Sequence, residues 1–243
     1  MMRTHWIAAG ALLSLVACSE KKDTRPVEAE PAEAAAKTPA EGEPAEAAAA
    51  DEGALLDVSK ATLTAPKAFT VKFATTKGDI LLDVHRDWAP HGADRFYNLV
   101  KAGYYDDTAF FRVIGGFMAQ VGISGRPEVN EVWRNARFPD DPVIKSNEPG
   151  YVTFAAASMP NSRTTQIFIN FGDNKRLDAM RFAPFAKVQD ASMEVVRKLH
   201  AGYGEGAPMG KGPAQGRLQA EGNGYLKKEF PQLDYIESAT VVD

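Results

Sequence analysis

A single arginine interrupts an apolar run and is the residue of this chain best placed to act on a bound ligand. The run covers residues 110–120 and reads Phe-Phe-Arg-Val-Ile-Gly-Gly-Phe-Met-Ala-Gln. Its first half is typical of a β-strand, with Arg112 in the middle. An arginine in such a run either lies buried against carboxylates and carbonyl oxygens or presents its five N–H donors to a ligand. The residue types alone leave both alternatives open.

Other common catalytic arrangements are missing from the sequence. Cys18 is the only cysteine, and it precedes the globular part of the chain, which excludes a cysteine nucleophile or a cysteine-based metal site there. The histidines of that part are not spaced as metal ligands. The glycine-rich stretch 202–216 contains Gly210-Lys211, but Gly212 stands where a phosphate-binding loop has Ser or Thr. The sequence therefore predicts no metal and no cofactor, and these glycines predict a loop.

The charge balance argues against binding to nucleic acid. The 243 residues include 32 acidic and 28 basic side chains, for a net charge of -4, whereas nucleic-acid binders carry a strongly basic surface. A chain of this length suits one domain with additional segments. No apolar run after residue 17 is long enough to span a bilayer.

The N-terminus has the features of an export signal. Arg3 precedes an apolar run, residues 6–17, that is too short for a stable membrane span. The run ends in Leu-Val-Ala-Cys, which resembles the bacterial lipobox, where the signal is cut before the cysteine and the cysteine is acylated. This implies a signal peptide at 1–17 and lipidation of Cys18; an ordinary cleaved signal is the alternative. Ser19 resembles lipoproteins sorted to the outer membrane, so we expect an exported, membrane-anchored lipoprotein on the periplasmic face of that membrane.

Residues 18–66 have the composition of a spacer. Alanine, glutamate and proline dominate, and no aromatic residue occurs between Cys18 and Phe69. Such a segment buries too little apolar surface to offset the entropy of ordering it. We therefore expect a disordered tether with a reach of about 40 Å. Removing residues 1–66 should then leave the stability of the rest unchanged.

From Lys67 onward the pattern is that of one globular domain, residues 67–243. Apolar and polar residues alternate in short runs, which predicts strands. Apolar residues at helical spacing predict a helix that opens at Pro90 and ends at Gly103, and a second helix is expected from Ala191 to His200. Many short strands with two helices favour an antiparallel barrel or sandwich. The expected strands cover 69–73, 80–84, 110–114, 117–121, 151–156, 166–170, 185–188 and 235–242.

Four segments of this domain resemble the cyclophilin family. The arginine segment is similar to the family's F-H-R-V-I-P-G-F-M-x-Q-G-G, and residues 153–169 are similar to its S-M-A-N-A-x-P-N-T-N-x-S-Q-F-F-I. Leu177-Asp178 resembles the W-L-D block, and Phe-Ala-Lys-Val at 185–188 resembles F-G-K-V. The segments occur in the family's order and at about its spacing, over roughly residues 69–242. On these motifs the chain is identified as a member of the family.

The resemblance implies a mainly β fold, an eight-stranded antiparallel closed barrel capped by two α-helices, with the substrate groove on its outside. It implies a peptidyl-prolyl cis-trans isomerase that acts on proline-containing polypeptides without a cofactor, and we expect a monomer. Arg112 matches the catalytic arginine, which would stabilise the twisted amide. The matched substrate-binding residues are Phe117, Met118, Phe168 and Leu177 in an apolar proline pocket, Gln120 and Gln166 along the groove, and Ala156 and Ala157, whose backbone would pair with the substrate.

Several departures from the family pattern affect the site. Near the histidine of the pocket wall this chain has one extra residue and offers Met180, Arg181 or Phe182; a shifted alignment places Phe182 in the wall. Phe111 replaces the family's usual histidine. Arg176 stands where many members have the tryptophan associated with cyclosporin binding, which argues against strong cyclosporin sensitivity.

A non-catalytic module is the main alternative function. A groove of this type could hold proline-containing segments, as a binding or chaperone module, without turning them over. Arg112 separates the two interpretations, because binding alone does not require a donor aimed at the twisted amide. A purely structural envelope lipoprotein would leave the groove residues unexplained. Residues 202–234, longer than the family's usual connection, could pack beside the groove or contact a partner.

Overall fold

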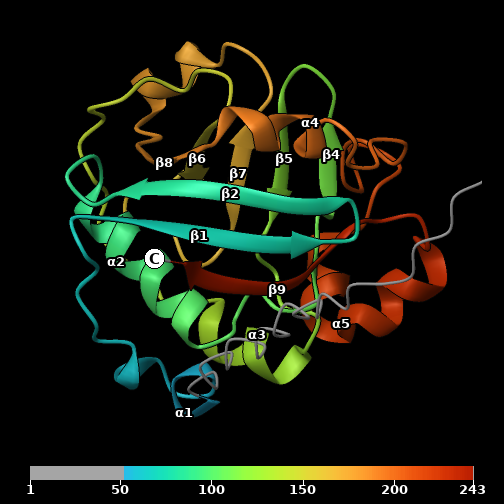
Figure 1. Ribbon diagram of the computed structural model, residues 1–243. Coiled ribbons are helices and arrows are strands. Elements are labelled where there is room, and N and C mark those ends of the chain that lie inside the picture. Colours follow the sequence, from blue (N-terminus) through green and yellow to red (C-terminus); the bar gives the residue numbers. More distant parts are fainter. Residues whose placement is uncertain (1–51, 243) are drawn as a thin grey trace, which may run out of the picture. The chain divides into compact units, whose positions relative to one another are not determined.

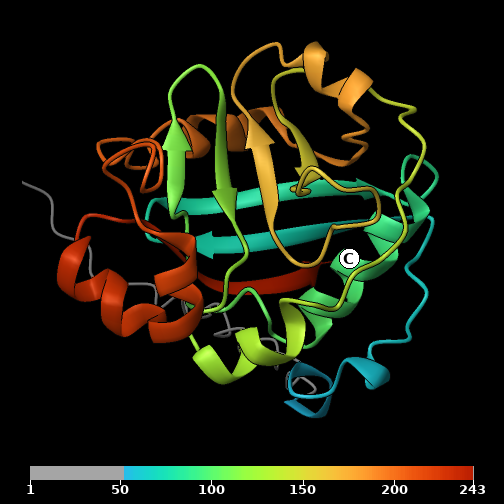
Figure 2. The same cartoon turned by 180° about the vertical axis from the view of Figure 1, so that it is seen from behind.

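Nine antiparallel strands form one curled sheet in the computed structural model, which describes residues 52–242 (Figure 1). The predicted signal peptide, Cys18 and the spacer as far as residue 51 lie outside these residues. The strands follow the order β3-β9-β1-β2-β8-β6-β7-β5-β4, and β1, β2 and β9 cross β4, β5 and β7 steeply (Figures 1 and 2). Their bounds are β1 Ala68–Thr75, β2 Gly78–His85, β3 Thr108–Ala109, β4 Arg112–Ile114, β5 Met118–Val121, β6 Tyr151–Phe154, β7 Ile167–Asn170, β8 Pro184–Val188 and β9 Tyr235–Val242.

The two edges of the sheet belong to one segment of the chain, so the sheet closes on itself. β3 ends at Ala109 and β4 begins at Arg112, with only Phe110 and Phe111 between them. The N–H of Phe110 donates to the carbonyl of Asp234 (2.9 Å). The predicted antiparallel barrel is confirmed. It has nine strands and not eight among residues 52–242, because this segment is divided into two.

Alternation of side chains along β1 and β2 builds the core of the barrel. Successive residues of a strand point to opposite faces, and the inward set of these two strands has no exposed surface: Val71, Phe73, Ile80, Leu82 and Val84. Burying a side chain of this size stabilises the fold by about 1.5–3 kcal/mol. The predicted first hairpin is therefore present and faces the core as its pattern requires.

Helices pack against the barrel (Figure 2). α2 Pro90–Lys101 contacts β8 and β9, and the backbone N–H groups of His91 and Gly92 at its start donate to the carboxylate of Asp141 (3.0 and 2.8 Å). This is the first predicted helix. α3 Pro127–Trp133 and α5 Gln215–Glu229 contact each other, and the sequence pattern predicts neither. No helix among residues 52–242 is both long and apolar enough to cross a membrane.

α5 lies in the segment whose role the sequence left open, and it covers a second apolar cluster outside the barrel. The helix bends at Gly222, where φ is 60°. A Cβ at Gly222 would lie 2.1 Å from the carbonyl oxygen of Gly125, so this close approach requires glycine. The cluster under α5 consists of Ala109, Phe111, Ile123, Leu218, Tyr225, Leu226, Phe230 and Leu233.

The second predicted helix, 191–200, is present but ends four residues earlier than expected. The structure has a 3-10 turn at Asp190–Ser192 followed by one helical turn, α4 Met193–Val196. Beyond α4, the N–H of His200 donates to the carboxylate of Asp234 (2.7 Å). This long-range hydrogen bond replaces the one to the carbonyl four residues earlier, and helix propensity alone is too weak to oppose it.

Residues 52–66 are part of the domain, which contradicts the prediction of a spacer as far as residue 66. α1 Glu52–Leu55 and a 3-10 turn at Val58–Lys60 precede an extended stretch. Ala54 and Leu55 are buried. The indole N–H of Trp133 donates to the carbonyl of Leu55 (2.8 Å), so this part of the predicted tether covers the side of α3.

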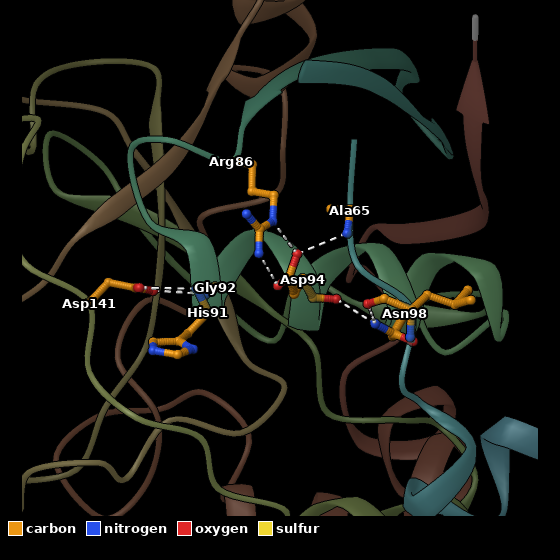
Figure 3. A network of polar contacts seen from close by, with 8 residues as sticks. Ala65, Arg86, His91, Gly92, Asp94, Asn98 and Asp141 are labelled. Atoms are coloured by element: carbon orange, nitrogen blue, oxygen red, sulfur yellow. Dashed lines mark hydrogen bonds and ion pairs between the residues drawn. The ribbon is translucent and has the colours of Figure 1, made fainter. Parts of the chain in front are cut away.

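The extended stretch after Lys60 is fastened to α2 (Figure 3). The backbone of Leu63 exchanges two hydrogen bonds with the side-chain amide of Asn98 (2.9 and 2.7 Å). The N–H of Ala65 donates to the carboxylate of Asp94 (2.8 Å), which also accepts from the guanidinium of Arg86 (2.7 and 2.8 Å). These contacts use backbone groups of the stretch, which every residue type carries, so its amino-acid composition does not predict them.

Candidate active site

A groove of about 470 Å³ lies on the outer face of strands β4, β5 and β7. Alternate residues of these strands point to opposite faces of the sheet. One set is buried in the core of the barrel: Val113, Ala119, Val121, Ile167 and Ile169. The other set lines the groove. The groove contains every residue predicted for the site: Arg112, Phe117, Met118, Gln120, Ala156, Ala157, Gln166, Phe168, Leu177 and Phe182.

Strand register brings the polar groove residues side by side. Gln120 in β5 is the partner of Arg112 in β4, and Phe168 in β7 is the partner of Gln120. Nη1 of Arg112 donates to Oε1 of Gln120 (2.9 Å), and Nε2 of Gln120 donates to Oε1 of Gln166 (2.8 Å). The three polar side chains therefore form one hydrogen-bonded row along the groove.

The residues predicted to hold the proline ring form an apolar cluster in the same groove. Met118, Phe168 and Leu177 are buried, and Phe117 and Phe182 pack against them. The rings of Phe168 and Phe182 meet edge to face, with centroids 5.8 Å apart. A small apolar ring fits the chemistry of this surface, because all five side chains lack charge and three of them are buried.

Phe182, and not Met180 or Arg181, lines the wall of the pocket. Met180 is 61% exposed. Arg181 has a φ of 66° at the end of the 3-10 turn Lys175–Met180, which is a left-handed conformation that reverses the chain. The next side chain, Phe182, then points back to the groove, in agreement with the shifted alignment.

Two departures from the family pattern have clear partners. The guanidinium of Arg176 lies over the ring of Phe117, with Cζ 4.8 Å from the centroid, so a cation stacks on this wall where many members have tryptophan. Phe111 is buried in the cluster under α5, together with Leu218 and Leu226. An apolar residue at 111 is therefore required by the helix that covers it.

Partly buried hydrogen bonds hold the pocket residues Leu177 and Phe182 in place. Asp178 accepts hydrogen bonds from the hydroxyl of Ser146 (2.5 Å) and from the backbone and side-chain N–H groups of Asn147 (3.0 and 2.7 Å). The amide of Asn147 also donates to the carbonyl of Phe182 (2.8 Å). Burial raises the pKa of Asp178, but these hydrogen bonds outweigh burial and hold the pKa below its ordinary value.

Replacing Asp178 with alanine is expected to weaken peptide binding, because the turn that carries Leu177 loses its anchor. Hydrogen bonds to a charged group contribute about 1.5–3 kcal/mol each, so KM should rise roughly tenfold with a smaller change in kcat. Initial rates over a range of peptide concentrations measure both constants. Asp173→Ala is the control, because Asp173 lies on the same loop with its side chain 62% exposed. Equal KM values in the two variants would contradict this role.

The structure adds a residue to the site that no motif identifies. Glu205, in the glycine-rich stretch, binds the guanidinium of Arg112 with both carboxylate oxygens, 2.6 Å from Nε and 2.6 Å from Nη2. The hydrogen bonds from Arg112 outweigh partial burial and hold the pKa of Glu205 below its ordinary value. The carboxylate partner of the first alternative is therefore present, and the side chain of Arg112 also lines the groove.

Residues far from the motifs complete the groove. Arg134 and Arg137 lie at and just after the end of α3 and add positive charge, while Gln215 and Gln219 of α5 add amides. They reach the groove only because α3 packs against α5, and sequence spacing does not reveal this contact. Within residues 52–242, no group of three His, Cys, Asp or Glu side chains could hold a metal ion.

Comparison with known proteins agrees with the motifs. Residues 70–215 match the family model described as cyclophilin type peptidyl-prolyl cis-trans isomerase/CLD. A relative from Escherichia coli named peptidyl-prolyl cis-trans isomerase B is 31% identical over 188 residues, covering 70% of this chain and 98% of the relative. Another from Dictyostelium discoideum, named peptidyl-prolyl cis-trans isomerase cypE, is 36% identical over 135 residues, covering 54% of this chain and 85% of the relative.

Solved structures agree with the fold. The crystal structure of a Cryptosporidium parvum cyclophilin type peptidyl-prolyl cis-trans isomerase has a TM-score of 0.55 at 18% sequence identity, and covers 72% of this chain and 98% of its own. At this identity the likeness shows the architecture alone. With the match of residues 70–215 and the E. coli relative, the conclusion is that this chain belongs to the cyclophilin-type peptidyl-prolyl cis-trans isomerases.

Proposed function

We propose that this isomerase acts on X-Pro bonds of exported polypeptides and that Arg112 stabilises the twisted amide. Rotation about an amide bond is resisted by about 18–20 kcal/mol, because the nitrogen shares its lone pair with the carbonyl. As the bond twists, the nitrogen becomes pyramidal and its lone pair becomes a hydrogen-bond acceptor. A donor aimed at this lone pair stabilises the twisted state more than the planar one, which is what catalysis requires.

The position of Arg112 beside the apolar pocket is the observation that carries this proposal. Nη1 of Arg112 lies 3.8 Å from Sδ of Met118, an atom of the pocket cluster. A proline ring held in this cluster would stay still beside the guanidinium while the carbonyl side of the bond rotates. A thousandfold acceleration needs only about 4 kcal/mol, which one charged donor and a fixed ring can supply.

A second observation supports a proline-containing ligand. A Cryptosporidium parvum cyclophilin type isomerase was crystallised in the presence of the dipeptide Ala-Pro, and its fold is similar to this one, with a TM-score of 0.54 at 20% identity. The groove of this chain combines an apolar pocket with a row of amide and guanidinium groups. That combination suits a peptide, which has both an apolar ring and a polar backbone.

A protease-coupled assay with a prolyl peptide tests the activity directly. Uncatalysed cis-trans conversion takes tens to hundreds of seconds, and the chain from Glu46 onward is expected to shorten this time. Peptide binding without acceleration would overturn the proposal and identify a binding module instead.

We also propose that acylated Cys18 anchors the enzyme at the periplasmic face of the outer membrane, where exported polypeptides are its clients. The support is the Leu-Val-Ala-Cys motif after a short apolar run, followed by Ser19. One acyl chain binds a bilayer only marginally, whereas two or three form a stable anchor.

Cys18→Ser is expected to release the protein from the membrane. Wild type and variant are expressed in a bacterial host with two membranes, and membrane and soluble fractions are separated with and without detergent. The wild type should follow the membrane and gain the mass of acyl chains. The variant should keep its uncut signal or appear as soluble exported protein. Wild type recovered in the soluble fraction, cleaved and without lipid, would contradict the anchor and leave the isomerase activity unaffected.

A further inference from the structure

We propose that Glu205 is a positioning residue, which orients the guanidinium of Arg112 toward the substrate amide and thereby sets kcat. This inference rests on the proposed role of Arg112. Nothing in the motifs around Arg112 identifies Glu205, because 92 residues lie between them in the sequence. Three independent features of the structure bring the two side chains together: the backbone pairing of the loop, the glycines within it, and the geometry of the ion pair.

The loop that carries Glu205 pairs with the strand that carries Arg112. Gly204 forms an isolated antiparallel bridge with Val113 of β4. In antiparallel pairing, the residue after one partner lies opposite the residue before the other, so Glu205 lies opposite Arg112. The meeting of the two side chains is therefore set by the backbone and not by two flexible side chains finding one another.

Backbone hydrogen bonds and close-packed glycines hold Glu205 in this place. Its carbonyl accepts from the N–H of Gly212 (2.8 Å), and the N–H of Gly206 donates to its Oε1 (2.9 Å). A Cβ at Gly210 would lie 2.2 Å from the carbonyl oxygen of Glu205, and one at Gly212 would lie 2.9 Å from it. The loop can fold this tightly only with glycine at these positions. The glycines of this loop therefore allow the backbone to hold the Glu205 carboxylate in position.

The ion pair fixes the plane of the guanidinium. Both oxygens of Glu205 accept from Arg112, at Nε and Nη2 (2.6 Å each), while Gln120 accepts from Nη1 (2.9 Å). Bidentate pairing of this kind adds directional restraint as well as attraction. With three nitrogens engaged, the long side chain of Arg112 cannot turn the group away from the groove. The Glu205 side chain is 38% exposed, and exposed ion pairs contribute little to global stability, so the main effect is orientation.

Glu205→Ala is expected to lower kcat about tenfold while KM stays within about twofold of wild type, because misorientation costs rate and the apolar pocket is untouched. Glu205→Gln keeps the length and one acceptor and should recover part of the rate. Glu221→Ala is the matched control: Glu221 pairs bidentately with Arg217 on α5 (2.8 and 3.0 Å), and Arg217, unlike Arg112, does not line the groove. Equal kcat values in Glu205→Ala and Glu221→Ala would overturn the proposal.

A double variant separates this inference from the function of Arg112. In an Arg112→Ala background, Glu205→Ala should cost no further rate, because Glu205 acts through the arginine. A further loss there would overturn the positioning role. If Arg112→Ala itself keeps wild-type turnover, the proposed function fails. If only Arg112→Ala is impaired, that function stands and the Glu205 inference fails.

A variant of the loop tests whether the glycines hold Glu205 in place. Gly210→Ala leaves both charged side chains but displaces the Glu205 carbonyl, so it is expected to lower kcat with little change in KM. An unchanged kcat would contradict the role of this loop in holding Glu205.

Discussion

Replacing Arg112 with alanine is expected to lower kcat/KM for a prolyl peptide by at least tenfold while the fold is retained. A hydrogen bond from a charged donor contributes about 1.5–3 kcal/mol, and about 1.4 kcal/mol is a factor of ten in rate. The side chain lies on the outer face, in the groove and not in the barrel core, so its loss opens no core cavity. The protease-coupled assay gives the rate, and a thermal melt on the same sample reports the fold.

Two further variants define what Arg112 contributes. Arg112→Lys should also be impaired, because an ammonium keeps the charge but lacks the planar fork that Glu205 and Gln120 hold. Arg126→Ala is the control, since Arg126 forms an exposed pair with Glu128 (2.8 Å) away from the groove. Wild-type turnover in Arg112→Ala would remove this residue from the mechanism.

Removing residues 46–66 is expected to destabilise the domain by about 3 kcal/mol or more. The fully buried indole of Trp133 would lose the Leu55 carbonyl that accepts its N–H, and Asn98 would lose both hydrogen bonds to Leu63. For a domain of this size, such a loss lowers the melting temperature by about 6–12 °C. The measurement compares a chain that starts at Glu46 with one that starts at Lys67.

A pair of neighbouring residues provides the control for this prediction. Leu55 is 7% exposed, whereas Leu56 is 50% exposed. Leu55→Ala in the longer chain should lower the melting temperature, because truncating a buried leucine costs about 2–5 kcal/mol, and Leu56→Ala should change it little. Identical melting temperatures for the chains starting at Glu46 and Lys67 would show that residues 52–66 add nothing to stability.

The strands could be predicted because side-chain alternation along them is regular, while the closed barrel and the groove residues are what the resemblance to the cyclophilin family implies. Val71 and Phe73 in β1, and Ile80 and Leu82 in β2, repeat every second residue and are all buried. The strand arginine stands out because a charge in such a run requires a partner or a ligand, and the structure provides a carboxylate partner for it while the arginine itself lines an open groove. Patterns of this kind involve residues close together in the chain, so they can be recognised from the sequence alone.

The parts that the sequence did not predict depend on contacts between distant segments. Residues 52–66 lack aromatic side chains, yet their backbone meets Asn98 and Asp94 of α2. The expected helix at 191–200 ends at Val196, and beyond it the backbone of His200 bonds the distant Asp234. Glu205 lies among glycines that predict only a loop, and its meeting with Arg112 depends on a bridge between Gly204 and Val113. None of these partners lies at a spacing that a helix or strand period would reveal.

The order of the strands also determines when this domain can finish folding. β9 is the last strand in the sequence, yet it lies between β1 and β3, so residues 235–242 pair with strands that are synthesised far earlier. Until the ribosome has released these residues, the outer edge of β1 has no partner and β3 cannot join the sheet. Pairing between distant segments is the slow kind. Closure of the barrel is therefore a step that follows synthesis of β9.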